Sequence, residues 1–400
     1  MDFELNEEQQ LLADSVRKYL ASAYDFEARK KIITSPAGFS QPAWTMLSEI
    51  GLTAIPFATS AGGFGGGAVD MMAAMEAFGE SLVVEPLLDH IALASRLIAH
   101  AGTPAQRAEV LPALMDGSRK ATFAYLERGR RYALDAATTT AAKSATGWTL
   151  SGEKIVVIGA PLADVFVVSA KTTSGTGLFL VDSKSASVRI NAYRTVDGQR
   201  AGDVTFSNVA LNADAMLGGD AMLAADATPG AGLGTDSNAL VAIEEAIDFA
   251  TALLCAEAVG AMKYACDATL EYIKTRKQFG APIGTFQALQ HRMVDMFMAA
   301  EQSRSMAVMV ACKVDAAANA GNVSELGDAA VIAARKKAVS SAKVFIADAA
   351  RLVSQESVQL HGGMGMTEEM KISHTFRRLT VLAQRFGDAD HHLARYAAAN

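Results

Sequence analysis

The spacing between apolar residues changes twice along the chain, and this limits the folds that the chain can adopt. Between residues 120 and about 210, short β-branched segments such as DVFVVSAKT and GLFLVDSK alternate roughly between apolar and polar residues, as half-buried strands do. The chain before residue 118 and from Asn238 onward has the wider apolar spacing of helices. This order predicts an α+β multidomain protein with domains at 1–118, 119–236 and 237–400.

Each section carries its own local signals. Asn6 is the expected N-cap of the first helix. The middle section is expected to form a small β-barrel or sandwich, with a hairpin turn at Ser151-Gly152 and a Gly/Ala-rich linker at its end. The last section is expected to form a four-helix bundle whose long helix stops at Gly362-Gly363. The run SAGGFGGGAVD lacks both the Lys-Ser/Thr pair and the preceding strand of a phosphate loop, so it is expected to be a flexible connector.

Composition excludes several classes of protein. A net charge of −7 without a basic run argues against nucleic acid as a partner. No uninterrupted apolar run approaches the roughly 20 residues that span a bilayer, and the acidic N-terminus is unlike a signal peptide. No CxxC spacing occurs among the three cysteines, Cys255, Cys266 and Cys312. They are therefore expected to be reduced thiols of a cytoplasmic protein.

Two motifs carry chemistry, and the first is YIKTRKQFGAPIGTFQALQHRMVDM, residues 272–296. A helix is expected to end near Arg276, and Gln278-Phe279 lie in the break before a new helix that carries Gln287. A guanidinium, an amide and an aromatic ring in one break suit a pyrophosphate and a planar ring. On spacing alone, an ordinary αα-hairpin is favoured.

The second motif is QLHGGMGMTEE, residues 359–369. Three glycines in four positions let the backbone approach a ligand, and free N–H groups can point at an anion. Thr367 is expected to cap the next helix, with Glu368 and Glu369 in its first turn. A glycine-rich helix corner is again the local alternative.

Together and in this order, the two motifs resemble the signatures of the acyl-CoA dehydrogenase family, and the resemblance covers nearly the whole chain. RKQFGAPIGTFQALQH is similar to the family's R-x-Q-F-G…F-Q…Q-H, and QLHGGMG to its Q-x-x-G-G-x-G. From SAYDFEARK, FGGG and FGDADHHLARY, the nearest resemblance is to the small subunit of pimeloyl-CoA dehydrogenase and related two-subunit enzymes.

This resemblance implies FAD-dependent α,β-desaturation of an acyl-CoA thioester, with a Glu as base and electron-transferring flavoprotein as electron acceptor. In the family each FAD spans a subunit boundary, and the neighbouring subunit clamps its adenine and diphosphate. The clamp positions map here onto Arg276, Gln278, Phe279, Gln287, Gln359, Gly362 and Gly363.

The chain departs from the family where the flavin ring would lie. The family's Thr-Glu-Pro segment is matched by Leu126-Glu127-Arg128, and its Trp-Ile-Thr segment by Val156-Val157-Ile158. Leu126 and Ile158 have no side-chain donor, and each unpaired polar group costs on the order of 1–3 kcal/mol when buried. Flavin binding in this chain's own cleft is therefore not expected.

The position of the catalytic Glu is also changed. The position falls on Phe386, and the position that some relatives use instead lies near Ala250, within IDFATALLC. For AQRFGDADHH three interpretations remain: a metal site, an Asp388 base, and a helix cap formed by Asp388 or Asp390. The cap is favoured, because adjacent side chains diverge on a helix and Asp388 is displaced from the Glu position.

Three functions therefore compete. The first is a non-catalytic subunit that completes the FAD site of a larger homologous subunit in a heterotetramer. The second is a self-sufficient homo-oligomeric enzyme with Asp388, Glu244 or Glu245 as base. The third is a flavin-free assembly protein. The acyl group stays open between dicarboxylyl, fatty and steroid side-chain thioesters.

Overall fold

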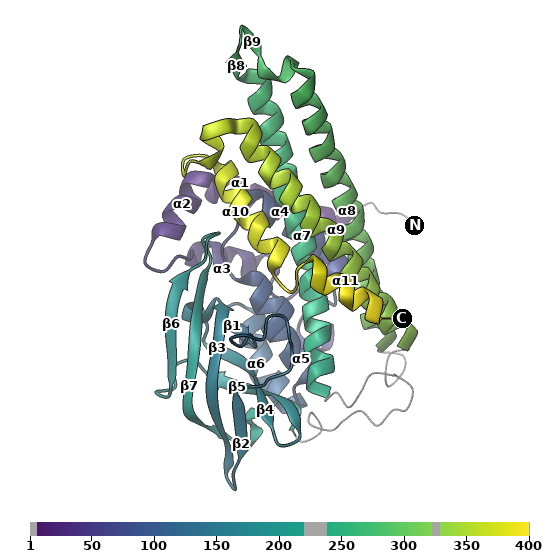
Figure 1. Cartoon of the computed structure of the whole chain (residues 1–400). Coiled ribbons are helices and arrows are strands. Elements are labelled where there is room, and N and C mark those ends of the chain that lie inside the picture. Colours follow the sequence, from purple (N-terminus) through teal and green to yellow (C-terminus); the bar gives the residue numbers. More distant parts are fainter. Residues whose placement is uncertain (1–5, 220–237, 322–328, 400) are drawn as a thin grey trace. The chain divides into compact units, whose positions relative to one another are not determined.

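The computed structural model describes residues 6–219, 238–321 and 329–399, and these fall into two compact units (Figure 1). The first unit comprises Met1–Thr34, Gly67–Val83 and Thr251–Asn400. The second comprises Ser35–Gly66 and Val84–Ala250. Most of the predicted Gly/Ala-rich linker, residues 220–237, lies outside the described residues.

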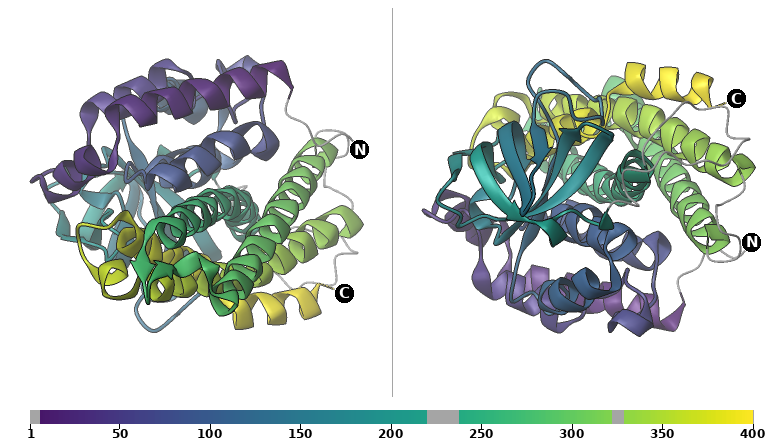
Figure 2. Two further views of the ribbon diagram at one scale, coloured as in Figure 1. Left: turned by 90° about the horizontal axis from the view of Figure 1, so that it is seen from above. Right: turned by 90° about the horizontal axis from the view of Figure 1, so that it is seen from below.

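The first unit is helical, and its long helices run side by side (Figures 1 and 2). Its elements are α1 (Glu7–Ala23), α2 (Phe26–Thr34), α4 (Ala68–Ser81), the later part of α7 (Asn238–Thr275), α8 (Gln287–Gly321), α9 (Ala329–His361), α10 (Lys371–Gln384) and α11 (Ala389–Ala398). Asn6 caps α1 as predicted, in a capping box with Gln9.

Glycine allows two of these helices to approach closely. A Cβ on Gly79 of α4 would lie 1.9 Å from the Glu257 carbonyl oxygen, and a Cβ on Gly260 of α7 would lie 1.9 Å from the Glu76 carbonyl oxygen. A buried ion pair then joins α7 to α10, because Arg378 donates to both carboxylate oxygens of Glu257 at 2.6 and 2.8 Å. These contacts fix the part of α7 that leads to the first motif.

The second unit combines a sheet with short helices. The helices are α3 (Gln41–Glu49), α5 (Arg96–Ala101), α6 (Pro104–Met115) and a π-helical segment, η2 (Asp89–Ser95). The strands are β1 (Ala121–Ala124), β2 (Thr140–Lys143), β3 (Gly147–Ile158), β4 (Val165–Thr172), β5 (Gly175–Asp182), β6 (Val188–Arg194) and β7 (Arg200–Asn212).

The strands, which are labelled in Figure 1, form one sheet in the order β1-β4-β2-β3-β7-β6, with β5 paired to β4. Phe166, Phe179, Phe206 and Trp148 pack in its core. The expected β domain is confirmed, although β2 and β6 were not predicted. β2 is short and reads TAAK, and β6 exposes every second residue or more, so neither has a strong apolar alternation.

The predicted hairpin turn at Ser151-Gly152 is wrong. β3 continues through both residues and pairs with β7 on either side of them, Leu150 with Val209 and Gly152 with Phe206. The register shifts between these pairs, and Gly152 has φ 145°. The extra residue lies in β7, where Ser207 and Asn208 face Ser151 of β3 and Asn208 has φ 55°. Gly152 therefore lies in a continuous strand opposite a β-bulge, where glycine is common, as it is in turns.

Two further local predictions are corrected. The glycine run connects helices but is not free, because Phe64, Gly65 and Gly66 donate backbone hydrogen bonds to the carbonyls of residues 54–57. Thr367 does not cap α10. Its hydroxyl donates to the Met364 carbonyl at 3.0 Å, and α10 begins only at Lys371, after Glu368 and Glu369.

The three cysteines are free thiols, with Cys255 and Cys266 buried and Cys312 half-buried. None of the described helices has a stretch long and apolar enough to cross a membrane.

Candidate functional site

The first motif forms the tip of a helical hairpin in the first unit, at the end of the bundle (Figure 1). α7 ends at Thr275, two short strands follow, β8 (Lys277–Gln278) and β9 (Ala281–Pro282), and α8 starts at Gln287. Phe279 lies in the turn with φ 55° and is 90% exposed. Positive φ is uncommon for an aromatic residue. The Phe279 ring meets only the edge-to-face ring of Phe286 among the ring pairs of the described residues, at 6.2 Å between centroids, and its exposed area is available to a ligand or a partner.

The second motif forms the corner between α9 and α10. α9 ends at His361, and Gly362 follows in the left-handed region with φ 61°. A Cβ at Gly362 or Gly363 would meet nothing within 4 Å, so the backbone here is open to an approaching group. This agrees with the predicted glycine stop.

The structure brings the two motifs together through an aromatic pair that the sequence did not identify. Tyr272 lies one helical turn before Arg276, and His361 directly precedes Gly362. Their rings stack with centroids 4.3 Å apart, and the Tyr272 hydroxyl donates to the His361 carbonyl at 3.3 Å. A Tyr four residues before the motif Arg and a His before the glycine pair were visible in the sequence, but nothing there linked them.

The name clamp is used below for the seven residues that were predicted to hold the adenine and diphosphate of FAD. All seven are exposed: Arg276, Gln278, Phe279, Gln287, Gln359, Gly362 and Gly363. An exposed guanidinium, amides, an aromatic ring and open glycine backbone form a donor set that fits a diphosphate with an attached planar base. The clamp residues therefore fit the adenosine diphosphate half of FAD.

The segment that matches the flavin bed lies in the second unit and is built around a buried ion pair. Lys154 is fully buried and donates to Glu127 Oε1 at 2.9 Å and to Ser169 at 3.1 Å. Burial lowers the pKa of Lys154 to about 8. Burial would raise the pKa of Glu127, but hydrogen bonds from the Thr139 backbone, Lys154 and the Thr138 backbone outweigh it and bring this pKa to about 2. The pair holds the loop after β1 in place.

The side chains of Leu126 and Ile158, which would lie beside a flavin ring, cannot donate hydrogen bonds to it. Leu126 and Ile158 are half-buried and have no polar side-chain atom. The backbone N–H of Ile155 donates to the Leu126 carbonyl at 2.9 Å, and that of Val156 donates to Asp203 at 3.1 Å. These two backbone donors are already used within the chain, and the Arg128 guanidinium lies 3.6 Å from Glu153 and 3.7 Å from Asp203. The donors of this segment are therefore directed to the chain itself and do not fit the polar edge of the isoalloxazine.

Val156 is also in an unusual conformation. It has φ 52° beside a register shift in β3, and it is 42% exposed. A β-branched residue at positive φ is strained, and such a bulge re-aims the side chains around it. The backbone of this chain therefore departs from regular strand geometry at a position where the family motif has its Trp.

Phe386 and Ala250 were predicted at or near the positions of the family's Glu, and neither side chain is an acid. Phe386 is 7% exposed with φ 62°, and Ala250, at the alternative position, is fully buried. Asp388 accepts a hydrogen bond from the His391 backbone at 2.9 Å and is the N-cap of α11, as favoured from the sequence. Among the described residues, no group of three or more His, Cys, Asp or Glu side chains is placed to hold a metal ion.

A buried lysine holds this turn, and sequence reasoning did not identify it. Lys343 of α9 donates to the carbonyls of Leu382, Ala383 and Gly387 at 2.9, 2.8 and 3.1 Å. The sequence feature that could have identified Lys343 is that it is the only charged residue in the mostly small and apolar stretch VSSAKVFIA. Lys343 satisfies carbonyls at the end of α10 and so fixes the path of residues 385–388.

Glu245, one of the alternative bases, is already engaged in the second unit. The Arg96 guanidinium donates to both of its carboxylate oxygens at 2.5–3.1 Å and lies 3.8 Å from the Phe249 ring centroid. A carboxylate in a bidentate ion pair is stabilised as the anion and is poorly placed to take a proton.

Family models match the chain along almost its whole length. Residues 6–118 match the N-terminal domain of acyl-CoA dehydrogenase, residues 122–209 its middle domain and residues 240–399 its C-terminal domain.

Individual proteins agree with this. The chain is 26% identical over 376 residues to acyl-CoA dehydrogenase FadE27 of Mycobacterium tuberculosis, covering 94% of this chain and 92% of that protein. It is 27% identical over 349 residues to the caffeyl-CoA reductase-Etf complex subunit CarC of Acetobacterium woodii. This match covers 85% of this chain and 84% of that protein. A solved variant of the Tcur3481-Tcur3483 steroid ACAD is 28% identical with a TM-score of 0.81, covering 98% and 97%.

Proposed function

Since this chain belongs to the acyl-CoA dehydrogenase family of FAD-dependent oxidoreductases, we propose that it is the non-catalytic subunit of a heteromeric member. In this role it completes the FAD site of a larger homologous subunit, and the acyl-CoA thioester is bound and oxidised mainly there. The proposal includes domains at 1–118, 119–236 and 237–400 and a cytoplasmic location. It also includes a role like that of the small subunit of pimeloyl-CoA dehydrogenase.

One observation carries the proposal: the clamp fits its half of FAD while the flavin bed and the base positions of the same chain do not. When bound, FAD supplies the hydride-accepting chemistry of the family. In this chain Arg276 would pair with the diphosphate, Phe279 would pack beside the adenine, and the backbone at Gly362 and Gly363 would admit the ligand closely. Phe386 and Ala250 can take no proton.

The alternatives have less support. A self-sufficient enzyme would need Asp388, Glu244 or Glu245 as base. Of these, Asp388 caps α11 and Glu245 is paired with Arg96. A flavin-free assembly protein gives no reason for an exposed clamp. The name of CarC, a reductase in a complex with Etf, supports electron-transferring flavoprotein as a redox partner of the complex. The steroid ACAD favours a bulky acyl group among the expected thioesters.

The test is the visible absorbance of the purified chain, alone and with its flavin-bearing homologue. We expect no stoichiometric flavin and no dehydrogenation by the lone chain, and flavin in the complex that falls when Arg276 is replaced by Ala. Stoichiometric flavin with turnover in the lone chain would establish the self-sufficient enzyme instead. A complex that forms without any flavin-bearing homologue would establish the assembly protein.

A further inference from the structure

The backbone that carries Gly362 and Gly363 is held by residues outside the clamp. The two glycines open the 3₁₀ helix η7 (Gly362–Met366), and α10 begins at Lys371. A Cβ on either glycine would meet nothing within 4 Å, so packing at the glycines does not fix their position. Glycine also permits more backbone conformations than any other residue. We call residues 362–370 the glycine corner, and its conformation depends on anchors elsewhere in the first unit.

Two side chains from the first turn of α10 bind the glycine corner. Ser373 Oγ donates to the Thr367 carbonyl at 2.7 Å, and His374 Nε2 lies 3.1 Å from the Glu368 carbonyl oxygen. The same His374 nitrogen is 3.2 Å from a carboxylate oxygen of Glu368. The Thr367 hydroxyl donates in turn to the Met364 carbonyl at 3.0 Å. These contacts therefore reach back to the residue that directly follows the two glycines.

Arg29 of α2 determines which ring nitrogen of His374 carries the proton. An Arg29 guanidinium nitrogen lies 3.0 Å from His374 Nδ1, and a guanidinium can only donate, so Nδ1 accepts and the proton is on Nε2. The Nε2–H therefore donates to the Glu368 carbonyl. Arg29 is 1% exposed and His374 4%. Burial lowers the pKa of His374 to about 4, more than the hydrogen bond to Glu368 raises it, so the ring is neutral at pH 7.

Arg29 is itself fixed by the end of α4. Its Nε donates to the Leu82 carbonyl at 2.6 Å. The Phe26 ring, also on α2, meets the His374 ring edge-on with centroids 4.9 Å apart. A series of directional contacts thus runs from α4 through Arg29 and His374 to the glycine corner, and all of it lies in the first unit. The two ring nitrogens have different partners, which a side chain that only fills space does not require.

We propose that His374 is the positioning residue for the glycine half of the clamp, an inference that rests on the proposed function. The stack of Tyr272 on His361 holds the chain just before Gly362. The Nε2–H of His374 holds it on the other side, through the Glu368 backbone. With both ends fixed, the open backbone at Gly362 keeps one conformation before a ligand arrives, and preorganisation of this kind increases affinity.

The experiment compares His374→Gln with His374→Asn in the full chain. The amide nitrogen of Gln reaches the place of Nε2, whereas the shorter Asn amide reaches only that of Nδ1. Gln should therefore keep the bond to the Glu368 carbonyl, and Asn should lose it. Amide hydrogen exchange of the lone chain, read by mass spectrometry, measures the opening of residues 362–370. We expect exchange about tenfold faster with Asn, as for one lost hydrogen bond, and within about twofold of the unaltered chain with Gln.

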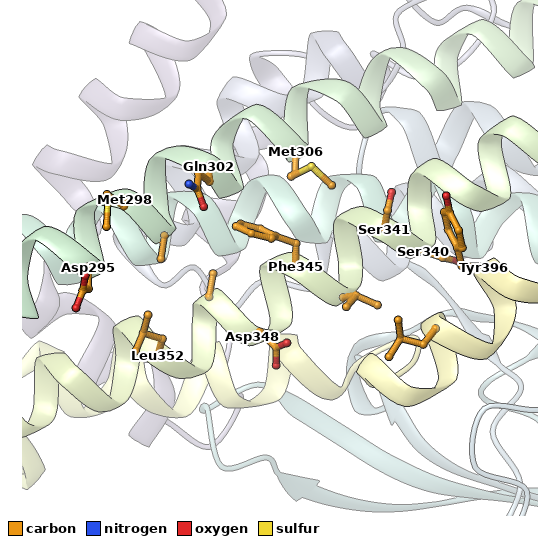
Figure 3. A pocket seen from close by; sticks show the side chains of 14 residues that line it. Asp295, Met298, Gln302, Met306, Ser340, Ser341, Phe345, Asp348, Leu352 and Tyr396 are labelled. Carbon is orange, nitrogen blue, oxygen red and sulfur yellow. The ribbon is translucent and has the colours of Figure 1, made fainter.

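Phe345→Leu is the matched control for the loss of a ring elsewhere in the bundle. Phe345 lines an apolar pocket between α8 and α9 (Figure 3), and it lies about 24 Å along α9 from His361. This variant should leave the exchange of residues 362–370 unchanged. The second readout is FAD retention by the complex with the flavin-bearing homologue. The Asn variant should lose FAD on dilution about tenfold more readily than the Gln variant does.

Equal exchange in the Gln and Asn variants would overturn the inference, because a side chain that only fills space has no use for one particular nitrogen. Arg276→Ala separates this result from the proposed function. If Arg276→Ala releases flavin from the complex but His374→Asn retains it fully, the proposed function stands and the inference is overturned. If Arg276→Ala also retains all flavin, the proposed function fails, whereas faster exchange in the lone Asn variant still supports His374 as the anchor of the glycine corner.

Discussion

The Tyr272 ring stacks on the His361 ring with centroids 4.3 Å apart, and this pair joins two motifs that are nearly ninety residues apart in the chain. The stack lies at the end of α7 on one side and at the end of α9 on the other. It therefore sets the separation between Arg276 and the open backbone at Gly362. Neither ring needs to touch a ligand for the pair to matter.

The stack predicts a change in flavin retention. Tyr272→Leu should weaken FAD retention by the complex about three- to tenfold, because an aromatic pair contributes about 0.5–1.5 kcal/mol beyond its area. Flavin released on dilution of the complex measures this. Tyr272→Phe keeps the stack and should retain FAD nearly as the unaltered chain does. Equal retention by the Leu variant would show that the pair does not position the clamp.

The close approach of α4 and α7 predicts a stability effect. Gly260→Ala places a Cβ 1.9 Å from the Glu76 carbonyl oxygen, and backbone cannot move aside as a side chain can. We expect the free energy of unfolding of the lone chain to fall by about 1–3 kcal/mol, the usual cost of overpacking. Denaturant titration measures it. Gly363→Ala, where a Cβ meets nothing within 4 Å, is the control for stability and should change little.

A buried histidine in the second unit predicts acid sensitivity. His90 Nδ1 accepts from the Ala121 backbone at 3.0 Å, so Nε2–H donates to the Leu114 carbonyl at 2.9 Å, and the ring is neutral. Burial lowers the pKa of His90 to about 4 from 6.5. Below pH 6.5 the unfolded chain binds a proton that the folded chain does not, so stability falls as pH drops towards 4.

The expected loss from His90 is about 2 kcal/mol between pH 7 and pH 5. Denaturation at both values in the unaltered chain and in His90→Gln measures it. The Gln variant should have lower stability at pH 7 and a smaller loss on acidification. His291→Gln, at an exposed position, is the control. An unchanged pH dependence in His90→Gln would mean that other groups cause the acid sensitivity.

The sequence predicted the order of helical and β sections, the α1 cap, the break before Gln287 and the stop at Gly362, because each depends on local backbone preferences. It could not distinguish a turn from a bulge at Ser151-Gly152. Glycine serves both, and only the pairing of β3 with β7 decides between them.

For the candidate site, residue identities were visible but their partners were not. The absence of an acid at Phe386 and of a donor at Leu126 could be read from the motifs. The contacts of Lys343 with three carbonyls and of Tyr272 with His361 join segments far apart in sequence. Such pairings depend on tertiary packing, which the spacing of residues in a single sequence does not determine.

The role of Asp388 gives the sharpest test of where the base lies. Asp388 accepts from the His391 N–H as the N-cap of α11, and Asn caps a helix about as well as Asp does. Asp388→Asn should therefore leave both the stability and the turnover of the complex nearly unchanged, whereas Asp388→Ala should cost about 1 kcal/mol of stability without affecting the chemical step. Initial rates with a saturating acyl-CoA and a denaturant titration separate the two effects. A catalytic base replaced by an amide loses its proton acceptor, so a fall of a hundredfold or more in kcat with unchanged stability would place the base in this chain and contradict its assignment as the non-catalytic subunit.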